Sequence, residues 1–589
     1  ASSAAANLVF AGGTLEYTGA TASTNRNFTL NAGTNVIDIT NVATVLTMSG
    51  ASTATGNGFN KDGAGTLIIS GANLHTGTTT VNLGVLQYGA NNALANGAVT
   101  VNDGATYDLN GFSDAIGALT VNSGATGGTV TTGAGTLTLG GNVSSTGGAA
   151  NASISGNLAL GATRTFTVTN AADGLNVSAI VSGATFGVTK AGNGRLSFSG
   201  VNIYTGVTSI NAGILSVASI TNGGVAGNLG ASTNAAANLV LGGGTLEYTG
   251  ATASTDRNFI LTNATTSTIN ISDNASTLTI TGASTATTGN LVKSGDGSLT
   301  LSGSSAYTGT TTISAGALIA GANVAVSTNS PFGNAASAIV LGNAATTINN
   351  SSPSLLTGGA FIVARTVTVA NQATTGTYRI GGNTDNNSTF SGTITFSRPF
   401  SVVQVATTGS NTLNITGAIN GGLAGNKTVT FDNVGMVTKS TNAITNTTGT
   451  TLVRKINDGT LVMNVANSYT GGTTFDAGVI RLTNTAGFGV AGQALDFNGG
   501  ALVLATDASV NAYNTTIGGS VSIFSDRATT GPGIVHTLGT LSIGNSTLFS
   551  YLGLNVDDGL GGLTFGATTF TAATPVFDVS NGGMNVILG

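Results

Sequence analysis

The stretch Lys61–Tyr88, KDGAGTLIISGANLHTGTTTVNLGVLQY, recurs three more times along the chain with unchanged internal spacing. The other copies begin at Lys190, Lys293 and Lys455. In every copy an imidazole or phenol ring lies fourteen residues after the lysine, and a glycine lies twenty-three residues after it. Recurrence without insertions is typical of one structural unit stacked many times, so we interpret all of these as structural repeat positions. The ring and glycine positions are His75, Tyr204, Tyr307 and Tyr469, and Gly84, Gly213, Gly316 and Gly478.

Three pairs of alternating apolar or threonine residues inside each copy predict three short strands. The members of a pair are two positions apart, which places both side chains on the inward face of a strand. Gly-, Asn- and Thr-rich corners separate the pairs, and glycine accepts the positive φ of a corner without a Cβ clash. Three short strands joined by such corners describe one turn of a β-helix. The inward pairs are Leu67 and Ile69, Thr79 and Val81, Leu86 and Tyr88, Leu196 and Phe198, Thr208 and Ile210, Leu215 and Val217, Leu299 and Leu301, Thr311 and Ile313, Leu318 and Ala320, Leu461 and Met463, Thr473 and Phe475, and Ile480 and Leu482.

Two further periodicities indicate how far the solenoid extends. Ala98–Thr106 returns as Ala118–Thr126, an offset of 20 residues that matches one coil. A longer block, about residues 1–90, returns at about residues 232–322. We therefore expect an all-β chain, residues 1–589, that forms one continuous parallel β-helix (a β-solenoid) with coils of about 20–25 residues. The stretch of about residues 320–450 is the least regular, and we interpret it as coils with longer loops.

Composition and charge exclude several classes of protein. The 589 residues include 90 Gly and no Cys, and 40% are hydrophobic. Because the hydrophobic residues alternate in register, we prefer a folded solenoid to low-complexity disorder. The chain has 16 Lys+Arg against 21 Asp+Glu and no basic stripe, so nucleic acid is not an expected partner. No apolar run is long enough for a transmembrane helix, so we expect no transmembrane segment in this chain.

The repeat resembles the autotransporter-associated β-strand repeat, also called the passenger-associated transport repeat. The fourth copy departs from the family pattern, because Ile456-Asn457 replaces the first x-Gly and Val465 replaces a later Gly, and the first copy has His75 for Tyr. The resemblance implies a parallel, right-handed β-helix within a large adhesive or structural protein that is exported to the bacterial cell surface. It does not imply an enzymatic activity. The second copy carries the pattern at Lys190, Gly192, Gly194, Leu196, Phe198, Gly200, Tyr204, Thr205, Gly206, Thr208, Gly213 and Leu215.

Carboxylates that could serve acid–base chemistry are few and scattered. Glu16 and Glu247, the only glutamates, occupy equivalent places in the long repeat, and we interpret them as outward strand residues opposite Lys or Arg. Asp557 and Asp558 are adjacent, but Gly559 follows them, which favours a turn. A calcium site needs more oxygen ligands than this pair offers.

The two histidines do not indicate a metal site. His75 stands where the other copies have Tyr, and His536 is isolated. Without cysteine, a zinc site would lack ligands. We therefore predict no catalytic, metal-binding or cofactor-binding residues, no cofactor, and a chain that is not an enzyme.

The tyrosines that precede Thr-Gly are the most tempting candidate for a ligand site. A row of exposed rings could stack on sugar rings, since an aromatic face plus a hydroxyl suits carbohydrate. We favour the alternative, in which each ring packs at a corner on the coil below and its hydroxyl bonds to the backbone. These residues are Tyr17, Tyr204, Tyr248, Tyr307 and Tyr469.

Three classes of function fit this sequence, and fold alone does not choose between them. We prefer a non-enzymatic structural or adhesive protein, extracellular on the bacterial cell surface, because it needs no active site. A polysaccharide-degrading β-helix would need clustered carboxylates and basic residues in a groove. A carbohydrate- or ice-binding module is the third class; for ice, the threonine runs 78–80 and 310–312 lie too far apart to build an array.

The two ends of the sequence favour self-association. A β-helix exposes unpaired backbone groups on its terminal coils, and solenoids normally close them with polar caps. This chain opens on ASSAAANLVF, similar to an internal stretch near Ala231, and closes on the apolar Met584–Gly589. We therefore expect identical chains to stack head to tail into an open filament. The alternative is a cut segment of an autotransporter passenger acting as an adhesin, with a surface polysaccharide or a host surface as partner.

Overall fold

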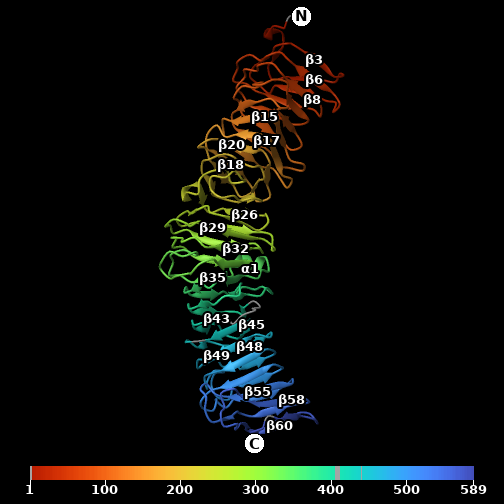
Figure 1. The fold of residues 1–589 in the computed structure, drawn as a ribbon. Coiled ribbons are helices and arrows are strands. Elements are labelled where there is room, and N and C mark those ends of the chain that lie inside the picture. The colour runs from red at the N-terminus through yellow and green to blue at the C-terminus, as the bar shows by residue number, and fades with distance from the viewer. Residues whose placement is uncertain (1–2, 405–410, 440, 581) are drawn as a thin grey trace. The chain divides into compact units, whose positions relative to one another are not determined.

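The computed structural model describes residues 3–404, 411–439, 441–580 and 582–589. Its contacts divide the chain into two units, Ala1–Gly289 and Asn290–Gly589, which run from red to green and from green to blue in Figure 1. Both units consist almost entirely of short strands. The helical segments among the described residues are η1 (Ala5–Asn7), η2 (Ala236–Asn238) and α1 (Ala344–Ile348). The predicted all-β class is confirmed.

In the first unit each coil adds one strand to a parallel sheet. Thr79 pairs with Val99, and Val99 pairs with Leu119, so one coil separates residues that are 20 positions apart. The strands of this sheet are β2 (Thr14–Tyr17), β5 (Val36–Ile39), β7 (Phe59–Asp62), β9 (Thr79–Val81), β11 (Val99–Val101), β14 (Leu119–Val121), β16 (Val143–Ser145), β18 (Arg164–Val168), β21 (Val188–Ala191), β23 (Thr208–Ile210), β25 (Leu239–Leu241) and β28 (Ile260–Leu261).

A second parallel sheet of the first unit takes another strand from each coil. Leu86 of this sheet pairs with Leu67 on one side and with Tyr107 on the other. Leu67 and Leu86 belong to the first and third strands of the Lys61 copy, which therefore lie on consecutive coils. The prediction that the three strands of one copy form a single turn is wrong, because the repeat is longer than one coil. Its strands are β3 (Ala22–Thr24), β6 (Val45–Met48), β8 (Thr66–Ile69), β10 (Val85–Tyr88), β12 (Thr106–Asp108), β15 (Thr129–Leu139), β17 (Ala152–Ala159), β19 (Gly174–Val177), β22 (Arg195–Phe198), β24 (Ile214–Val217), β26 (Thr245–Tyr248) and β29 (Thr266–Ile271).

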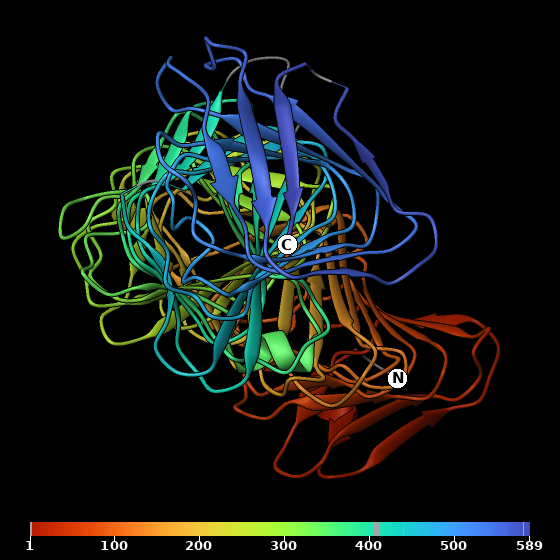
Figure 2. The ribbon, with the colours of Figure 1, turned by 90° about the horizontal axis from the view of Figure 1, so that it is seen from below.

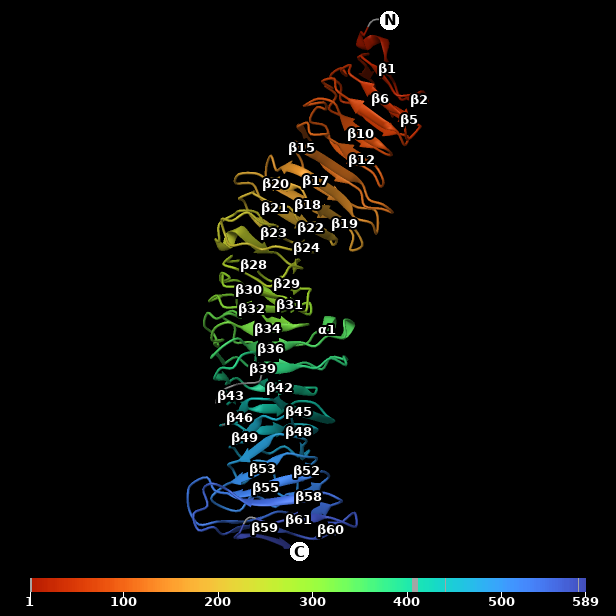
Figure 3. The same cartoon turned by 45° about the vertical axis from the view of Figure 1, so that its right-hand side comes forward.

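The second unit repeats this plan. Its third repeat copy begins in β31 (Asn290–Ser294), which pairs with β33 (Thr311–Ile313). Figure 3 shows β34, β36, β39 and β42 of its long sheet following one another in order. The strands of that sheet are β32 (Ser298–Leu301), β34 (Ala317–Ala320), β36 (Ser354–Thr357), β39 (Arg379–Gly382), β42 (Phe400–Gln404), β45 (Asn426–Asn433), β48 (Thr450–Ile456), β50 (Thr473–Phe475), β52 (Ala494–Phe497), β54 (Asn514–Ile517), β57 (Leu541–Ile543) and β60 (Thr568–Phe570).

Three further parallel sheets complete the second unit. One contains β31 and β33, followed by β35 (Ile339–Leu341), β38 (Val367–Val369), β41 (Ile394–Phe396), β44 (Ile419–Gly421) and β47 (Ile444–Asn446). Of the other two, the shorter consists of β56 (Val535–Thr537), β59 (Gly561–Phe565) and β62 (Met584–Leu588). Figure 2 shows blue strands near the C-terminus that lie side by side. Strands that stack in parallel, coil after coil, make each unit a parallel β-solenoid, as predicted. The strands of the longer sheet are β37 (Ile362–Val363), β40 (Ser388–Phe390), β43 (Thr412–Ile415), β46 (Met436–Lys439), β49 (Thr460–Met463), β51 (Val479–Leu482), β53 (Ala501–Ala505), β55 (Val521–Asp526), β58 (Thr547–Leu552) and β61 (Val576–Asp578).

The core of each unit is the column of inward side chains. All twelve predicted inward pairs are buried, so this prediction is confirmed. Phe198 packs edge to face on Phe166 of the preceding coil, with ring centroids 5.8 Å apart. Full burial of a Leu, Ile or Phe side chain contributes about 1.5–3 kcal/mol, so coil-to-coil stacking supplies the driving force that no single coil could provide.

The less regular stretch, about residues 320–450, contributes strands to the same sheets of the second unit. Its strands β36, β39, β42 and β45 pair in parallel. The longer connections include α1, whose first turn is capped by Asn343: Thr346 N donates to Asn343 Oδ1 at 3.3 Å, and Asn343 N donates to Thr346 Oγ1 at 3.0 Å. The extra length therefore lies in loops between coils.

Candidate functional site

The four repeat lysines are buried, and their ammonium groups donate hydrogen bonds to backbone carbonyl oxygens. Lys61 Nζ donates to the carbonyl oxygens of Asp62 and Gly63, each at 2.8 Å, and of Leu83 at 3.0 Å. Leu83 directly precedes the repeat glycine Gly84, whose φ of 67° turns that carbonyl toward the lysine. The ammonium thus joins a corner of one coil to the same corner of the next.

The other three copies repeat this arrangement, which explains the constant spacing between lysine and glycine. Lys190, Lys293 and Lys455 donate to the residues one and two positions later, and to the residue just before the repeat glycine. Lys439, outside the repeat, also donates to three carbonyls, those of Ile415, Gly417 and Asn442. The sequence did not predict that the lysines would be buried.

Burial changes the ionisation of these lysines but does not make them reactive. Desolvation lowers the pKa of Lys61, Lys190 and Lys455 to about 8 and that of Lys293 to about 7. A catalytic amine needs a free electron pair and access to substrate. Here carbonyl oxygens engage the ammonium groups and the side chains are buried, so the lysines hold the fold.

The repeat tyrosines are buried too, which decides between the two interpretations of the Tyr-Thr-Gly triplets. Tyr204 shares a hydrogen bond of 2.7 Å with Thr208 Oγ1, and Tyr307 and Tyr469 bond in the same way to Thr311 and Thr473. The rings therefore pack inside the coils, but their hydroxyls bond to a threonine side chain rather than to the backbone. Sugar stacking on these buried rings is excluded.

Tyr17 and Tyr248 occupy equivalent places in the long repeat and follow the backbone alternative. Their hydroxyls donate to the carbonyls of Ala20 at 2.6 Å and Ala251 at 2.5 Å. Each bond closes a short turn at the end of its strand, so these two tyrosines are also structural.

His75 takes the tyrosine's place with a different set of partners. Its Nε2 lies 3.2 Å from Thr79 Oγ1, and its Nδ1 lies 2.9 Å from Ser52 Oγ of the preceding coil. The ring packs edge to face on Phe59. Burial lowers the pKa of His75 to about 4, so the imidazole is neutral at physiological pH.

The scattered acidic residues are also committed to structure. Glu247 is buried and forms a bidentate ion pair with Arg195, whose strand lies two coils away. Burial alone would raise the pKa of the Glu247 carboxyl, but the bonds to Arg195 outweigh it, so the pKa is lowered. Its counterpart Glu16 is exposed, as predicted, but the residue opposite it on the paired strand is Asp38 rather than Lys or Arg, so that part of the prediction is wrong. Asp558 Oδ1 accepts from the backbone N–H groups of Gly533 and Leu560, each at 2.9 Å, which is the expected turn.

Neither a metal centre nor a membrane span emerges from the described part of the chain. Searching residues 3–404, 411–439, 441–580 and 582–589 finds no group of three or more His, Asp or Glu side chains placed to hold a metal ion. The same residues include no helix that is long and apolar enough to cross a membrane.

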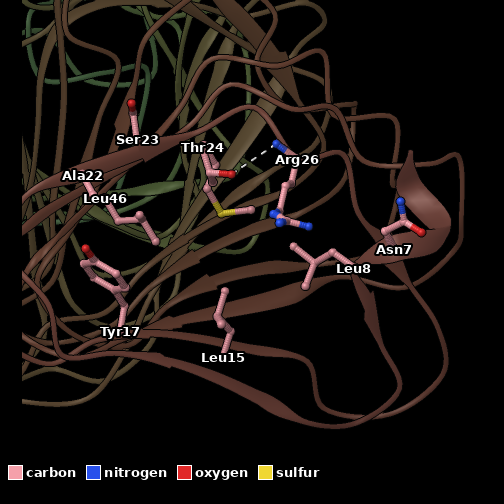
Figure 4. A pocket seen from close by; sticks show the side chains of 10 residues that line it. Asn7, Leu8, Leu15, Tyr17, Ala22, Ser23, Thr24, Arg26 and Leu46 are labelled. Carbon is pink, nitrogen blue, oxygen red and sulfur yellow. Dashed lines mark hydrogen bonds between the residues drawn. The ribbon is translucent and has the colours of Figure 1, made fainter. Parts of the chain in front are cut away.

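A cavity of about 380 Å³ opens near the first strands (Figure 4), where Leu15, Tyr17 and Leu46 face one another. In the second copy of the long repeat, the counterparts Leu246 and Tyr248 are buried. The difference arises because another segment of the chain covers the second copy. Arg257, the counterpart of Arg26, donates to carbonyls of that segment, those of Thr221, Gly230 and Ser232. We therefore interpret the cavity as an uncovered patch of solenoid core rather than as a ligand site.

A ladder of threonines lies on the first unit. Thr80, Thr100 and Thr120 lie in register on consecutive coils, and Thr120 shares a hydrogen bond of 2.9 Å with Ser144 of the next coil. The sequence analysis counted threonine runs and missed this column, because its members are 20 residues apart. Since the column is only one residue wide and ends at Ser144, it is not the regular two-dimensional array that ice binding requires.

Two exposed arginines lie on one column of the long sheet of the second unit. Outward residues of consecutive strands form one column, Arg379, Ser401, Thr430 and Arg454, which we call the arginine trough. A cavity of about 410 Å³ lies over it. Arg379 and Arg454 are exposed, and the residues between them, Ser401 and Thr430, have small side chains. A guanidinium group therefore stands at each end of the trough.

Arg398 shapes one wall of the trough. Its guanidinium donates to the carbonyls of Gln372, Thr374 and Gly376, and it stacks over the ring of Tyr378 at 4.2 Å from the centroid. These contacts hold the loop at residues 372–377 against the sheet. No local pattern in the sequence predicts the trough, because its residues come from four different coils.

These observations define a class of protein, a parallel β-solenoid whose repeat lysines, repeat tyrosines and His75 are buried and hydrogen-bonded within the coils. The passenger-associated-transport-repeat family model matches residues 59–87, 188–217, 291–320 and 453–482, which are the four repeat copies. The chain thus contains four passenger-associated transport repeats, at the positions where the sequence pattern predicts them.

A curated relative that is much longer than this chain matches part of it. The chain is similar to the adhesin BmaC autotransporter of Brucella suis biovar 1 (strain 1330), with 37% identity over 340 residues. The match covers 57% of this chain but 9% of the relative. No solved structure matches the chain.

Proposed function

We propose that this chain is a non-enzymatic, adhesive passenger segment that acts outside the cell, on a bacterial surface. The observation that carries the proposal is the similarity to an autotransporter adhesin, together with the four transport repeats. The described lysines, buried tyrosines and His75 support it, because their polar groups are bonded inside the coils and are not aimed at a substrate.

Adhesion is tested directly with the purified chain. Beads coated with the chain should bind to host-cell monolayers, whereas beads coated with an unrelated β-rich protein should not. If the two kinds of bead bind equally, the adhesive function is wrong. Incubation of the chain with a panel of polysaccharides and peptides should release no product, and turnover that is lost on changing one Asp would show an enzyme instead.

Head-to-tail assembly into a filament stays a prediction. It is tested by electron microscopy and light scattering of the purified chain across a concentration series. Growing filaments with the coil axis along the filament would support it, and discrete monomers at every concentration would exclude it.

A further inference from the structure

We propose that the arginine trough binds an acidic polysaccharide in which charged sugars alternate with neutral ones. The inference rests on the proposed adhesive function and deepens it by naming a ligand class. Arg379 and Arg454 would each hold a carboxylate or sulfate group, and the half-buried Thr430 would exchange hydrogen bonds with sugar hydroxyls between them, above the buried Ser401.

Arg379 is the strongest reason for the proposal. Its side chain is exposed, and among the residues that the structure describes it has no hydrogen-bond or ion-pair partner. A guanidinium offers several donors in a fixed fork that matches a carboxylate or sulfate in two parallel bonds. It is also the residue at which two neighbouring cavities meet, one of about 410 Å³ and one of about 370 Å³.

Arg454 is the second anchor, and its position sets the spacing. Its Nε donates to Asp476 at 2.6 Å, and its side chain is 53% exposed, so the outer edge of the guanidinium faces solvent. Three strand steps separate Arg454 from Arg379, which amounts to about 14 Å along the sheet. A ligand that reaches both arginines must be extended and must carry more than one anionic group.

The residues between the arginines favour neutral, hydroxyl-rich groups. Ser401 and Thr430 lie on the column itself, and Thr375 and Thr377 line the wall. Asp432 borders the same cavity and accepts from Asn457 Nδ2 at 2.5 Å, so a second anion at the centre would be repelled. Anions at the two ends and hydroxyls in the middle are the pattern of an alternating acidic polysaccharide.

An acidic peptide is the competing occupant, and the sheet argues against it. Peptides commonly bind sheets by adding a strand to a free edge. Here β39 pairs with β36 and β42, and β45 pairs with β42 and β48, so the trough offers side chains and no open backbone edge.

The test measures binding of the full chain to hyaluronate, whose acidic sugars alternate with neutral ones, and to neutral dextran and poly-glutamate. We expect hyaluronate to bind, and binding to weaken as salt screens the charges. Arg379→Gln and Arg454→Gln should each weaken binding about tenfold, and the double variant should weaken it more, because each change removes a charge-assisted contact. Arg26→Gln, at an exposed arginine outside the trough, is the matched control and should bind like the parent chain.

Several outcomes would overturn the proposal. These are equal binding of neutral dextran, absence of hyaluronate binding, unchanged binding in the double variant, an equal loss in Arg26→Gln, and tighter binding of poly-glutamate through the same arginines, which would show a peptide site. Bead adhesion to host cells, measured on the same variants, distinguishes a failure of the trough proposal from a failure of the proposed adhesive function. Adhesion without hyaluronate binding would contradict the trough alone, and hyaluronate binding without adhesion would contradict the proposed function.

Discussion

A repeat lysine is stabilised by three carbonyl oxygens in place of water. Lys190 Nζ lies 2.8, 2.7 and 3.1 Å from the carbonyls of Ala191, Gly192 and Ala212. A buried charge is tolerated only when its hydrogen bonds are made, and here one side chain satisfies three acceptors at a corner that no strand ladder reaches. The lysine is therefore a structural fastener between coils.

Replacing a repeat lysine should lower the local stability of the coil to which it belongs. In Lys190→Met three buried carbonyls lose their donor, and we expect local stability to fall by about 2–4 kcal/mol. Hydrogen exchange should speed up for amides near residues 188–217, and Arg26→Met, at an exposed site, should leave exchange unchanged. Equal protection in both variants would show that the lysine does not fasten the corner.

His75 should make one coil sensitive to acid. Its pKa is about 4 in the folded chain against an ordinary 6.5, so the unfolded state binds a proton first as the pH falls. The stabilisation is complete above pH 6.5 and is lost as the pH falls through 4, with a total of about 3 kcal/mol. His75→Tyr should abolish this loss, since Tyr fills the position in the other copies.

The reverse exchange tests the same idea. Tyr204→His should introduce acid sensitivity at a second coil, because the buried hydroxyl is replaced by a group that must charge on unfolding. Local hydrogen exchange between pH 7 and 4 measures both variants. Parallel pH curves for the parent chain and His75→Tyr would contradict the assignment.

At the scale of the coil, the corners limit which residues are allowed. Gly213 has a φ of 60°, and a Cβ built on it would lie 2.4 Å from the carbonyl oxygen of Gly192 on the preceding coil. Both the left-handed backbone and the close approach of two coils therefore require glycine. The repeat glycine and the repeat lysine act at the same corner.

A matched pair of glycine variants separates these two requirements. Gly224 also has a positive φ, 82°, but a Cβ there would meet nothing within 4 Å. Gly224→Ala should cost about 1 kcal/mol for the backbone alone, whereas Gly213→Ala should cost several kcal/mol more because the coils must move apart. Urea unfolding monitored by circular dichroism would compare them, and equal costs would show that coil packing does not constrain the corner.

For the whole molecule, stability should be the sum of neighbouring coils. Pairing joins each strand to the coil before and the coil after it, and the ion pair between Arg195 and Glu247 spans only two coils, so contacts within a unit stay between near neighbours. We expect calorimetric unfolding to be broader than two-state, with a calorimetric enthalpy larger than the van't Hoff enthalpy. Equal enthalpies would instead show that the chain unfolds as one cooperative body.

Much of the fold was predictable because the inward alternation is local. Leu196 and Phe198 are two residues apart, and their burial follows from period two alone. The buried rings were predicted in outline as well, although the pairing of Tyr204 with Thr208 was not. The burial of Lys190 could not be inferred, because its third acceptor lies on the next coil and a lysine in isolation is expected in solvent.

By itself the sequence determined the solenoid, its inward residues and its repeat positions, since these depend on short-range periodicity and on a repeat of fixed spacing. Only the tertiary structure decided the outer surface. Ser354 lies beside Arg379, and Thr430 lies beside Arg454, but Ala317 lies beside Ser354 across a much longer connection that contains α1. Loop length varies from coil to coil, so counting residues along the chain does not reveal which outward residues are neighbours. The neighbours that form the arginine trough are known only from the strand pairing.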